Sequence, residues 1–270
     1  MNKTIKLFYY KSKSGRLNFG DELSPEIVNY ITGLRVQRVN RNQCNLIAIG
    51  SILDKQLKFY NQLHNRISLK MSDPVFVWGS GLIINKKIKK PFFITLALRG
   101  KFTENNLDLS TDLDIPLGDP ALFVNNMLGL QVKRSGIGIV PHYTDKNHPI
   151  INDLKNIQNV KIIDVERNGS EVSSEIATCD FIISSSLHGL VVADSFGIPN
   201  YRVKLFDNLK GGNFKFRDYA SALGRKDIKP YELSFPKDIF TIIRSETDFG
   251  YQSNIDEICT RLEKALKKFF

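Results

Sequence analysis

The chain has 270 residues, of which 42% are hydrophobic, so it can bury one or two ordinary cores. Its net charge of +10 is spread over short basic groups without a nucleic-acid-binding motif, which ranks nucleic acid last among anionic partners. The charge then reflects an anionic substrate, an anionic membrane surface or a surface balanced for solubility. No apolar run reaches membrane-spanning length, and the three scattered cysteines argue against disulfides and zinc. We therefore expect a cytoplasmic protein that is soluble or in peripheral contact with the inner membrane surface.

The first half of the chain alternates between predicted strands and helices. Short apolar runs predict strands at residues 4–10, 35–39, 46–49, 75–77 and 92–98. A helix is expected to begin with Ser24 as its N-cap and Pro25 as its first residue, and to end at Gly33. A second helix is expected near residues 53–63, a turn at residues 79–81, and a short helix or turn over residues 119–127. This alternation predicts a parallel sheet, with the best domain boundary near residue 130.

A similar alternation fills the second half. Strands are expected at residues 136–140, 160–165, 181–183 and 200–203, with helices at residues 171–178 and 187–197. Three serines, ending at Ser186, separate the strand at residues 181–183 from the helix that follows and place His188 in its first turn. A helix N-terminus at the carboxyl end of a parallel strand suits a bound phosphate or carboxylate.

Together the two halves predict an α/β protein with two doubly wound, Rossmann-like domains, at residues 1–130 and 131–270. Ligands of such sheets bind at the carboxyl ends of the strands. The last segment, residues 255–270, has the apolar spacing of an amphipathic helix. We expect it to close the molecule by packing on one of the domains. The alternative is a basic helix that lies on a membrane holding lipid-linked sugar.

Six short motifs follow one another along the first two hundred residues or so. They are NFGDEL at residues 18–23, AIGSIL at 48–53, WGSG at 78–81, ALRG at 97–100, LGDPA at 117–121 and LHG at 187–189. In this order they resemble the polysaccharide pyruvyl transferases, which move pyruvate from phosphoenolpyruvate onto a sugar as a ketal. The resemblance implies a GT-B-like cleft, with residues 1–130 on the acceptor side and residues 131–270 on the phosphoenolpyruvate side. It also implies a galactose-type acceptor in a cell-surface polysaccharide or its lipid-linked precursor.

Ketal formation needs a general acid, a base, contacts for carboxylate and phosphate, and a polar surface for the sugar, but no metal or other cofactor. His188 is the expected acid, because an unperturbed histidine titrates near neutral pH; the alternative is a histidine that caps or packs a helix start. Asp21 is the expected base or partner of a sugar hydroxyl; the alternative is an aspartate that caps backbone N–H groups. The acidic residues Asp108, Asp112 and Asp114 are interpreted as a solvated turn rather than a metal site.

Further residues are expected to hold the substrates. Arg99 ends a predicted strand, where its guanidinium would clamp carboxylate or phosphate; a surface ion pair is the alternative. Many members of the family carry an arginine just before Leu-His, where this chain has Ser186. We expect Arg202 to supply the missing charge, ahead of Lys204 and Arg217. The other expected contacts also lie at strand ends and helix starts: Asn18, Ser80, Gly81, His142, Ser185, Ser186 and Leu187.

Two other functions fit the same fold and basic cleft. The first is a GT-B glycosyltransferase with a nucleotide-sugar donor, which is disfavoured because the second half lacks an acidic pair for ribose recognition. The second is a non-catalytic protein that binds a sugar or an anion at the serines and the helix start. Phosphate release from phosphoenolpyruvate in the presence of a galactoside distinguishes the three functions.

Overall fold

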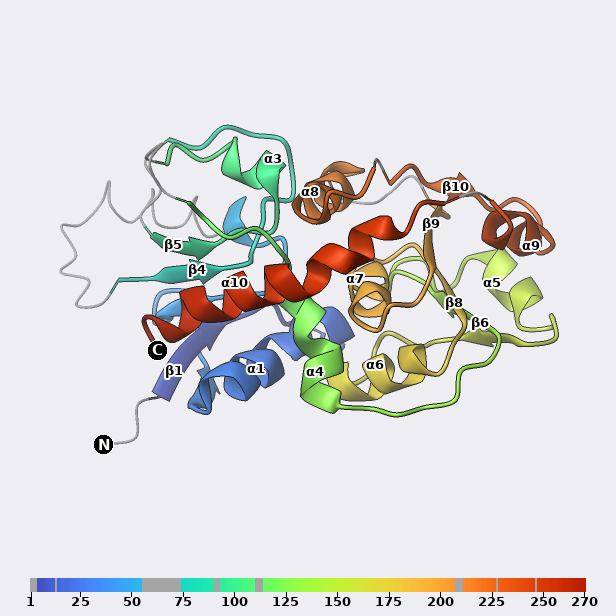
Figure 1. Cartoon of the computed structure of the whole chain (residues 1–270). Coiled ribbons are helices and arrows are strands. Elements are labelled where there is room, and N and C mark those ends of the chain that lie inside the picture. The colour runs from blue at the N-terminus through green and yellow to red at the C-terminus, as the bar shows by residue number, and fades with distance from the viewer. Residues whose placement is uncertain are drawn as a thin grey trace.

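The structure, a computed structural model, describes residues 4–12, 14–54, 74–89, 93–109, 114–206, 211–226, 228–245 and 247–270. Within these residues it has two five-stranded sheets, and neighbouring strands in both are parallel (Figure 1). The predicted α/β class with two parallel sheets is confirmed. The helix expected near residues 53–63 lies outside the described residues from residue 55 on, as does part of the acidic turn at residues 108–114.

The first sheet has the strand order β2-β1-β3-β4-β5. Its strands are β1 (Thr4–Phe8), β2 (Arg35–Arg38), β3 (Leu46–Ile47), β4 (Phe76–Trp78) and β5 (Ile94–Ala97). In the register of the central strands, Leu7 of β1 lies beside Leu46 of β3, and both side chains are fully buried. All five strands were predicted within a few residues. Short apolar runs mark the strands in the middle of a covered parallel sheet, whereas β2, at the edge, is mostly polar and exposed.

The second sheet has the strand order β10-β9-β8-β6-β7. Its strands are β6 (Ile137–Val140), β7 (Val160–Ile162), β8 (Phe181–Ser184), β9 (Asn200–Lys204) and β10 (Tyr231–Glu232), of which only β10 was not predicted. Numbered within its own half and read from β7, this order is the same 2-1-3-4-5 that the first sheet has. The prediction that the two halves share one plan is therefore confirmed.

Helices connect the strands, and η denotes a 3-10 helix. The first half contains α1 (Phe19–Thr32), α3 (Lys101–Glu104), η1 (Pro120–Phe123) and α4 (Val124–Leu128). The second half contains α5 (Pro149–Leu154), α6 (Gly169–Ala177), α7 (Leu187–Ser195), α8 (Phe214–Leu223), α9 (Asp238–Ile243), η2 (Gly250–Asn254) and α10 (Ile255–Lys267). Short helices such as α3, α5 and α9 were not predicted, because so few turns give no sustained apolar period. The predicted boundary near residue 130 falls in the interval between β5 and β6.

The predicted start of α1 is wrong. The helix begins at Phe19 with Asn18 as its N-cap, so Ser24 and Pro25 lie inside it. Ser24 does not cap the helix; its Oγ accepts a hydrogen bond from the N–H of Ile49 at 3.3 Å and so joins α1 to the loop after β3. The earlier start matters for the site, because it brings residues 18–21 to the carboxyl end of β1. The predicted end is confirmed: the helix is capped by a glycine at position 33 with φ of 66°.

One buried apolar cluster runs through both halves. It includes Leu7 of the first sheet, Ile182 of the second sheet, Leu190 of α7 and Leu262 of α10. Across the same boundary α1 packs on α6, and η1 packs on α7. Two further clusters, one for each sheet, contain the other buried apolar side chains. The shared core holds the halves against each other and fixes the relative positions of their strand ends.

The C-terminal helix α10 crosses from the second half back to the first (Figure 1). It packs against α1, η1 and β5, and its backbone carbonyl at Leu262 accepts a hydrogen bond from Trp78 Nε1 at 2.9 Å. Its apolar side is buried at Ile255, Cys259, Leu262 and Leu266. The predicted packing is confirmed, and protein occupies the face that would have lain on a membrane. Two parallel sheets of the same strand order, bridged by this helix, match the expected arrangement of two doubly wound halves. Among the described residues, no helix has the length and apolar character needed to cross a bilayer.

Candidate active site between the two sheets

A cavity of about 240 Å³, here named the inter-sheet cavity, lies between the two halves. Its walls come from the loops after β1, β3, β4, β6 and β8, from the starts of α1 and α7, and from α8. In the strand order 2-1-3-4-5, the connections after strands 1 and 3 leave on opposite faces of the sheet, which opens a crevice at their carboxyl ends. The cavity lies where the crevices of both sheets meet. Six predicted site residues line it: Asn18, Asp21, His142, Ser186, Leu187 and His188.

The turn between β8 and α7 is held by its own serines. Ser184 Oγ donates to the carbonyl of Val140 at 2.8 Å and accepts from the Ser186 N–H at 3.0 Å. Ser185 Oγ donates to the Asp145 carboxylate at 2.7 Å. Ser185 itself lines a neighbouring cavity rather than the inter-sheet cavity. Ser186 is the N-cap of α7. These bonds fix the start of α7, with its backbone N–H groups, at the wall of the inter-sheet cavity.

His188, in the first turn of α7, packs against the start of α1. A Cβ atom at Gly20 would lie only 1.9 Å from His188 Nδ1, so only glycine lets the ring come this close. Burial lowers the pKa of His188 to about 3, and the positive charges of Lys215 and Arg99, followed by His142, act in the same direction. The imidazole is therefore neutral at pH 7.

Asn18 and Asp21 face the same cavity from the start of α1. Asn18 Nδ2 donates to Asp21 Oδ2 at 2.8 Å, which holds the carboxylate at the cavity wall. The start of α1 is also tied to the second half, because the Phe19 N–H donates to the carbonyl of Val165 at 3.1 Å. The candidate base of the first half and the candidate acid of the second half therefore meet in one space.

Lys215, on α8, also lines the inter-sheet cavity and was missed by the sequence analysis. Burial lowers its pKa to about 8, and Arg99 and Arg202 act in the same direction, whereas the carboxylates of Asp21 and Asp145 raise it. The side chain therefore keeps its positive charge at pH 7. A signal for this helix exists in the sequence, because the buried residues 216, 219, 220 and 223 have helical spacing.

The expectation of an anion clamp at Arg99 is corrected. The side chain is fully buried behind the cavity wall, and protein groups engage all three guanidinium nitrogens. Nε donates to Asp218 Oδ2 at 3.0 Å, Nη2 donates to the Leu82 carbonyl at 2.6 Å, and Nη1 donates to Ser51 Oγ. Gly81 makes room for this group, since a Cβ atom there would lie 2.4 Å from Arg99 Cζ.

Ser80 has a supporting place as well. It is fully buried, and its Oγ donates to the carbonyl of Gly50 at 2.7 Å. Ser80, Gly81 and Arg99 therefore lie together behind the loop that follows β3 and support it through hydrogen bonds to Gly50 and Ser51. None of the three lines the cavity.

His142 does line the inter-sheet cavity. Its Nδ1 forms a hydrogen bond with Thr144 Oγ1 at 2.7 Å, and its ring lies against Tyr143 with centroids 4.4 Å apart. Burial, followed by the positive charge of Lys215, lowers the pKa of His142 to about 3. This second imidazole is therefore also neutral at pH 7.

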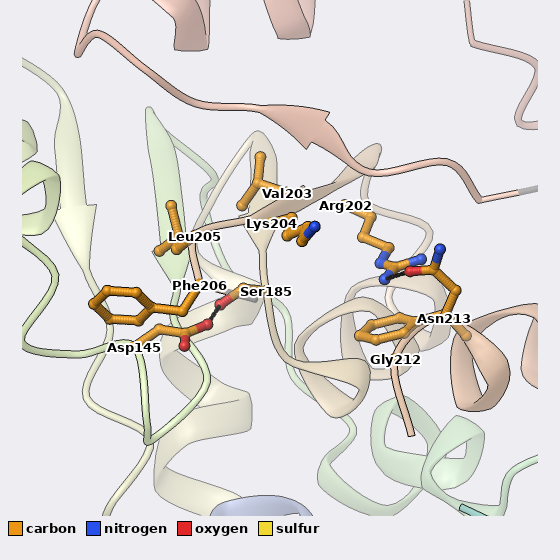
Figure 2. A pocket seen from close by; sticks show the side chains of 10 residues that line it. Asp145, Ser185, Arg202, Val203, Lys204, Leu205, Phe206, Gly212 and Asn213 are labelled. Atoms are coloured by element: carbon orange, nitrogen blue, oxygen red, sulfur yellow. Dashed lines mark hydrogen bonds between the residues drawn. The ribbon is translucent and has the colours of Figure 1, made fainter. Parts of the chain in front are cut away.

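Arg202 lines a separate space of about 180 Å³, here named the side cavity (Figure 2). Its guanidinium donates to the carbonyl of Ile228 at 3.0 Å and to Asn213 Oδ1 at 2.5 Å, and it lies 3.7 Å from the ring centroid of Phe216. Lys204 lines this side cavity too. Arg202 and Ser185 thus line the side cavity, whereas Ser186, whose missing charge Arg202 was expected to supply, lines the inter-sheet cavity.

The fold and the cavity define a two-domain α/β protein with a polar, cationic site between its sheets. A family model described as polysaccharide pyruvyl transferase matches residues 2–204. This match spans most of the chain, and the chain belongs to the polysaccharide pyruvyl transferase family.

Two curated relatives are similar to this chain. Uncharacterized protein L143 of Acanthamoeba polyphaga mimivirus is 32% identical over 171 residues, which cover 57% of this chain and 58% of that protein. The succinoglycan biosynthesis protein ExoV of Rhizobium meliloti (strain 1021) is 25% identical over 229 residues, which cover 82% of this chain and 65% of that protein. The chain thus spans less than two thirds of the length of either relative.

Two solved structures are similar in fold. The wall teichoic acid polymerase TagF has a TM-score of 0.46 and 13% identity, over 99% of this chain and 87% of that chain. The spinosyn rhamnosyltransferase SpnG has a TM-score of 0.36 and 10% identity, over 88% of this chain and 65% of that chain.

Proposed function

We propose that the chain is a pyruvyl transferase that moves pyruvate from phosphoenolpyruvate onto two hydroxyl groups of a saccharide, forming a ketal and releasing phosphate. The observation that carries this proposal is the inter-sheet cavity, where a neutral imidazole, a carboxylate and a lysine ammonium converge from both halves. Membership of the family supports it, as does the name of ExoV, a succinoglycan biosynthesis protein.

Two proton transfers balance this reaction. One acceptor hydroxyl adds to the central carbon of phosphoenolpyruvate, and the methylene carbon takes a proton and becomes a methyl group. The second hydroxyl then displaces phosphate at the same carbon. The two hydroxyl protons end on the methyl group and on phosphate. A group that gives a proton to carbon and a group that contacts the hydroxyls must therefore face one space.

We assign proton delivery to His188 and the hydroxyl contact to Asp21, which Asn18 holds in place. The carboxylate and phosphate of the donor are assigned to Lys215 and to the start of α7 at Ser186. The bound donor carries several negative charges, which oppose the effect of burial and raise the pKa of His188. Donor binding thus loads the histidine with the proton that it delivers.

The acceptor is proposed to be a galactose-type sugar of a cell-surface polysaccharide or its lipid-linked precursor. Tyr10 and Tyr143 line the inter-sheet cavity from opposite halves, and each has 39% of its surface exposed. Their rings offer apolar faces for a sugar ring, and their hydroxyls offer hydrogen bonds. The excess of basic residues suits contact with an anionic membrane surface near such a precursor.

The test is to incubate the protein with phosphoenolpyruvate and defined galactosides, and to follow phosphate release together with ketal formation by mass spectrometry. We expect both products in equal amounts. His188→Gln is expected to lower turnover by about a hundredfold or more, the usual effect of losing a general acid. His148→Gln is the matched control, since His148 lines neither cavity. Turnover of nucleotide sugars instead would identify a glycosyltransferase, and donor binding without phosphate release would identify a binding protein.

A further inference from the structure

Asp119, in the LGDPA motif, points a carboxylate oxygen at the back of His188. The aspartate is fully buried, and its Oδ1 accepts a hydrogen bond from the Ala121 N–H at 3.0 Å as the N-cap of η1. Its other oxygen, Oδ2, is buried without a hydrogen-bond partner among the described residues. The same is true of His188 Nε2, and these two atoms lie 3.9 Å apart.

Burial makes this arrangement costly unless the two atoms interact. A buried polar atom without a partner costs roughly 1–3 kcal/mol, and more when the group is charged. The separation of 3.9 Å is longer than a direct hydrogen bond, so the imidazole must move closer to Asp119 to form one. Hydrogen bonds in catalytic sites are often long before substrate binds and tighten in the complex.

The pair joins the two halves of the molecule. Asp119 stands after β5, at the start of η1, whereas His188 stands on α7, and η1 packs on α7 and α10. The carboxylate is held in place by its bond to Ala121, so the ring must adapt to it. With Nε2 directed to Asp119, Nδ1 is the other ring nitrogen that can carry the proton; it lies beside Gly20, on the start of α1 that also brings Asn18 and Asp21 to the inter-sheet cavity.

We propose that Asp119 is a positioning residue that accepts a hydrogen bond from His188 Nε2–H and thereby makes Nδ1 the nitrogen that delivers the proton. This inference rests on the proposed function, in which His188 protonates the donor. When the donor is bound, His188 carries a proton on both nitrogens, and Asp119 stabilises that imidazolium. The Nδ1 proton passes to the methylene carbon, which uses the electron pair of its double bond to form the new C–H bond. The ring is left neutral with its proton on Nε2, and Asp119 itself gains and loses none.

Other charged groups near Asp119 and His188 also shift the pKa values of these two residues. Arg99, from the end of β5, and Asp218, from α8, act on Asp119, while Arg99, Lys215 and His142 act on His188. Burial raises the pKa of Asp119 to about 6. The carboxylate is therefore mostly ionised at pH 7, as a hydrogen-bond acceptor must be.

The first test is Asp119→Asn. Its amide oxygen can keep the bond to the Ala121 N–H, so its NH₂ group faces His188 Nε2 as a donor and forces the ring proton onto Nδ1. Nitrogen NMR of labelled histidine should show the proton on Nε2 in the native protein and on Nδ1 in the variant, with the signal assigned by its loss in His188→Gln. We expect kcat to fall by about a hundredfold, with the KM for phosphoenolpyruvate changed much less.

A second variant, Asp119→Ser, keeps a side-chain acceptor for the cap but removes the group that faces His188. We expect it to lose kcat as the asparagine does while its thermal unfolding stays close to that of the native protein. An unchanged tautomer in Asp119→Asn, or native kcat in either variant, overturns the inference. If the native protein itself fails to turn over phosphoenolpyruvate, the proposed function fails, and the NMR result still decides whether Asp119 orients His188.

Discussion

Lys215 and His188 lie in the same cavity, and burial lowers the pKa of both, to about 8 and about 3. Because pH 7 lies between these values, the lysine keeps its charge and the histidine does not. A cation and a neutral imidazole therefore line one cavity. In the reaction proposed above, the ammonium would attract the anionic donor, and the donor would in turn raise the pKa of the histidine.

Lys215 is expected to supply the charge that Ser186 lacks. Lys215→Met should raise the KM for phosphoenolpyruvate at least about tenfold, because a charge-assisted hydrogen bond contributes roughly 1.5–3 kcal/mol. The measurement is steady-state phosphate release over a series of donor concentrations. Arg217→Met, on an exposed position of the same helix, is the control. A native KM in Lys215→Met combined with a raised KM in Arg202→Met would return the role to Arg202.

The protonation of His188 should also be visible in stability. Its pKa is about 3 in the folded protein and 6.5 in the unfolded chain, so only the unfolded chain binds a proton between these values. Its contribution to the free energy of unfolding is thus present above pH 6.5 and is lost, by about 1.4 kcal/mol per pH unit, as the pH falls toward 3. Asp119 acts oppositely: its pKa is raised from 3.8 to about 6, so its contribution is present at low pH and is lost as the pH rises through that window.

The two contributions oppose each other between pH 4 and pH 6, and single variants should separate them. His188→Gln should gain stability relative to the native protein as the pH falls, and Asp119→Asn should lose it. Urea unfolding at several pH values measures both differences. Differences that do not vary with pH would show that neither group titrates as described.

Among the secondary-structure elements, α8 is held in place by a buried polar cluster around Asp218. Its residue Asp218 accepts hydrogen bonds from the Thr103 N–H at 2.7 Å and from Thr103 Oγ1 at 2.6 Å, and its Oδ2 lies 2.8 Å from Arg99 Nη2. Both charged side chains are fully buried. The cluster joins α8, which carries Lys215, to α3 and the end of β5. It thereby sets the position of the cation in the inter-sheet cavity.

Removing one residue of this cluster should lower the stability of the folded protein, in addition to any effect on donor binding. Arg99→Ala is expected to lower the free energy of unfolding by about 3–5 kcal/mol, because it leaves the Asp218 carboxylate buried without its counter-charge. Denaturant titration measures the loss. Arg261→Ala is the control, since Arg261 pairs with Asp114 at an exposed site, where ion pairs contribute little. Native stability combined with lost donor binding in Arg99→Ala would restore the clamp.

At the scale of the whole molecule, the sequence predicted both sheets and the place where their crevices meet. Apolar runs and turn residues locate strand ends, and strand ends locate ligand sites in parallel sheets. Asn18, Asp21 and His188 accordingly lie around one cavity, although their chemical roles stay predictions.

What could not be predicted is which strand ends are covered by distant segments. Arg99 follows a strand, as a clamp would, but α8 covers it with Asp218, more than a hundred residues later in the chain. The cation that does reach the cavity, Lys215, sits on that same helix. The predicted start of α1 was wrong for another reason. Proline is common at the first position of a helix, and the sequence alone does not show that Pro25 lies inside one.

The return of α10 to the first sheet affects how the protein matures during synthesis. The ribosome synthesises the first half before α10, which packs on it. The acceptor of the Trp78 indole, the Leu262 carbonyl, lies 184 residues further along the chain. Until then Trp78, and the ring of Phe76 that later packs on Phe269 and Phe270, lack their cover. We therefore expect the nascent first half to present an apolar face of the kind that chaperones bind and that promotes aggregation. The native contacts of Trp78 and Phe76 with α10 and its C-terminal end can form only after these residues have been synthesised.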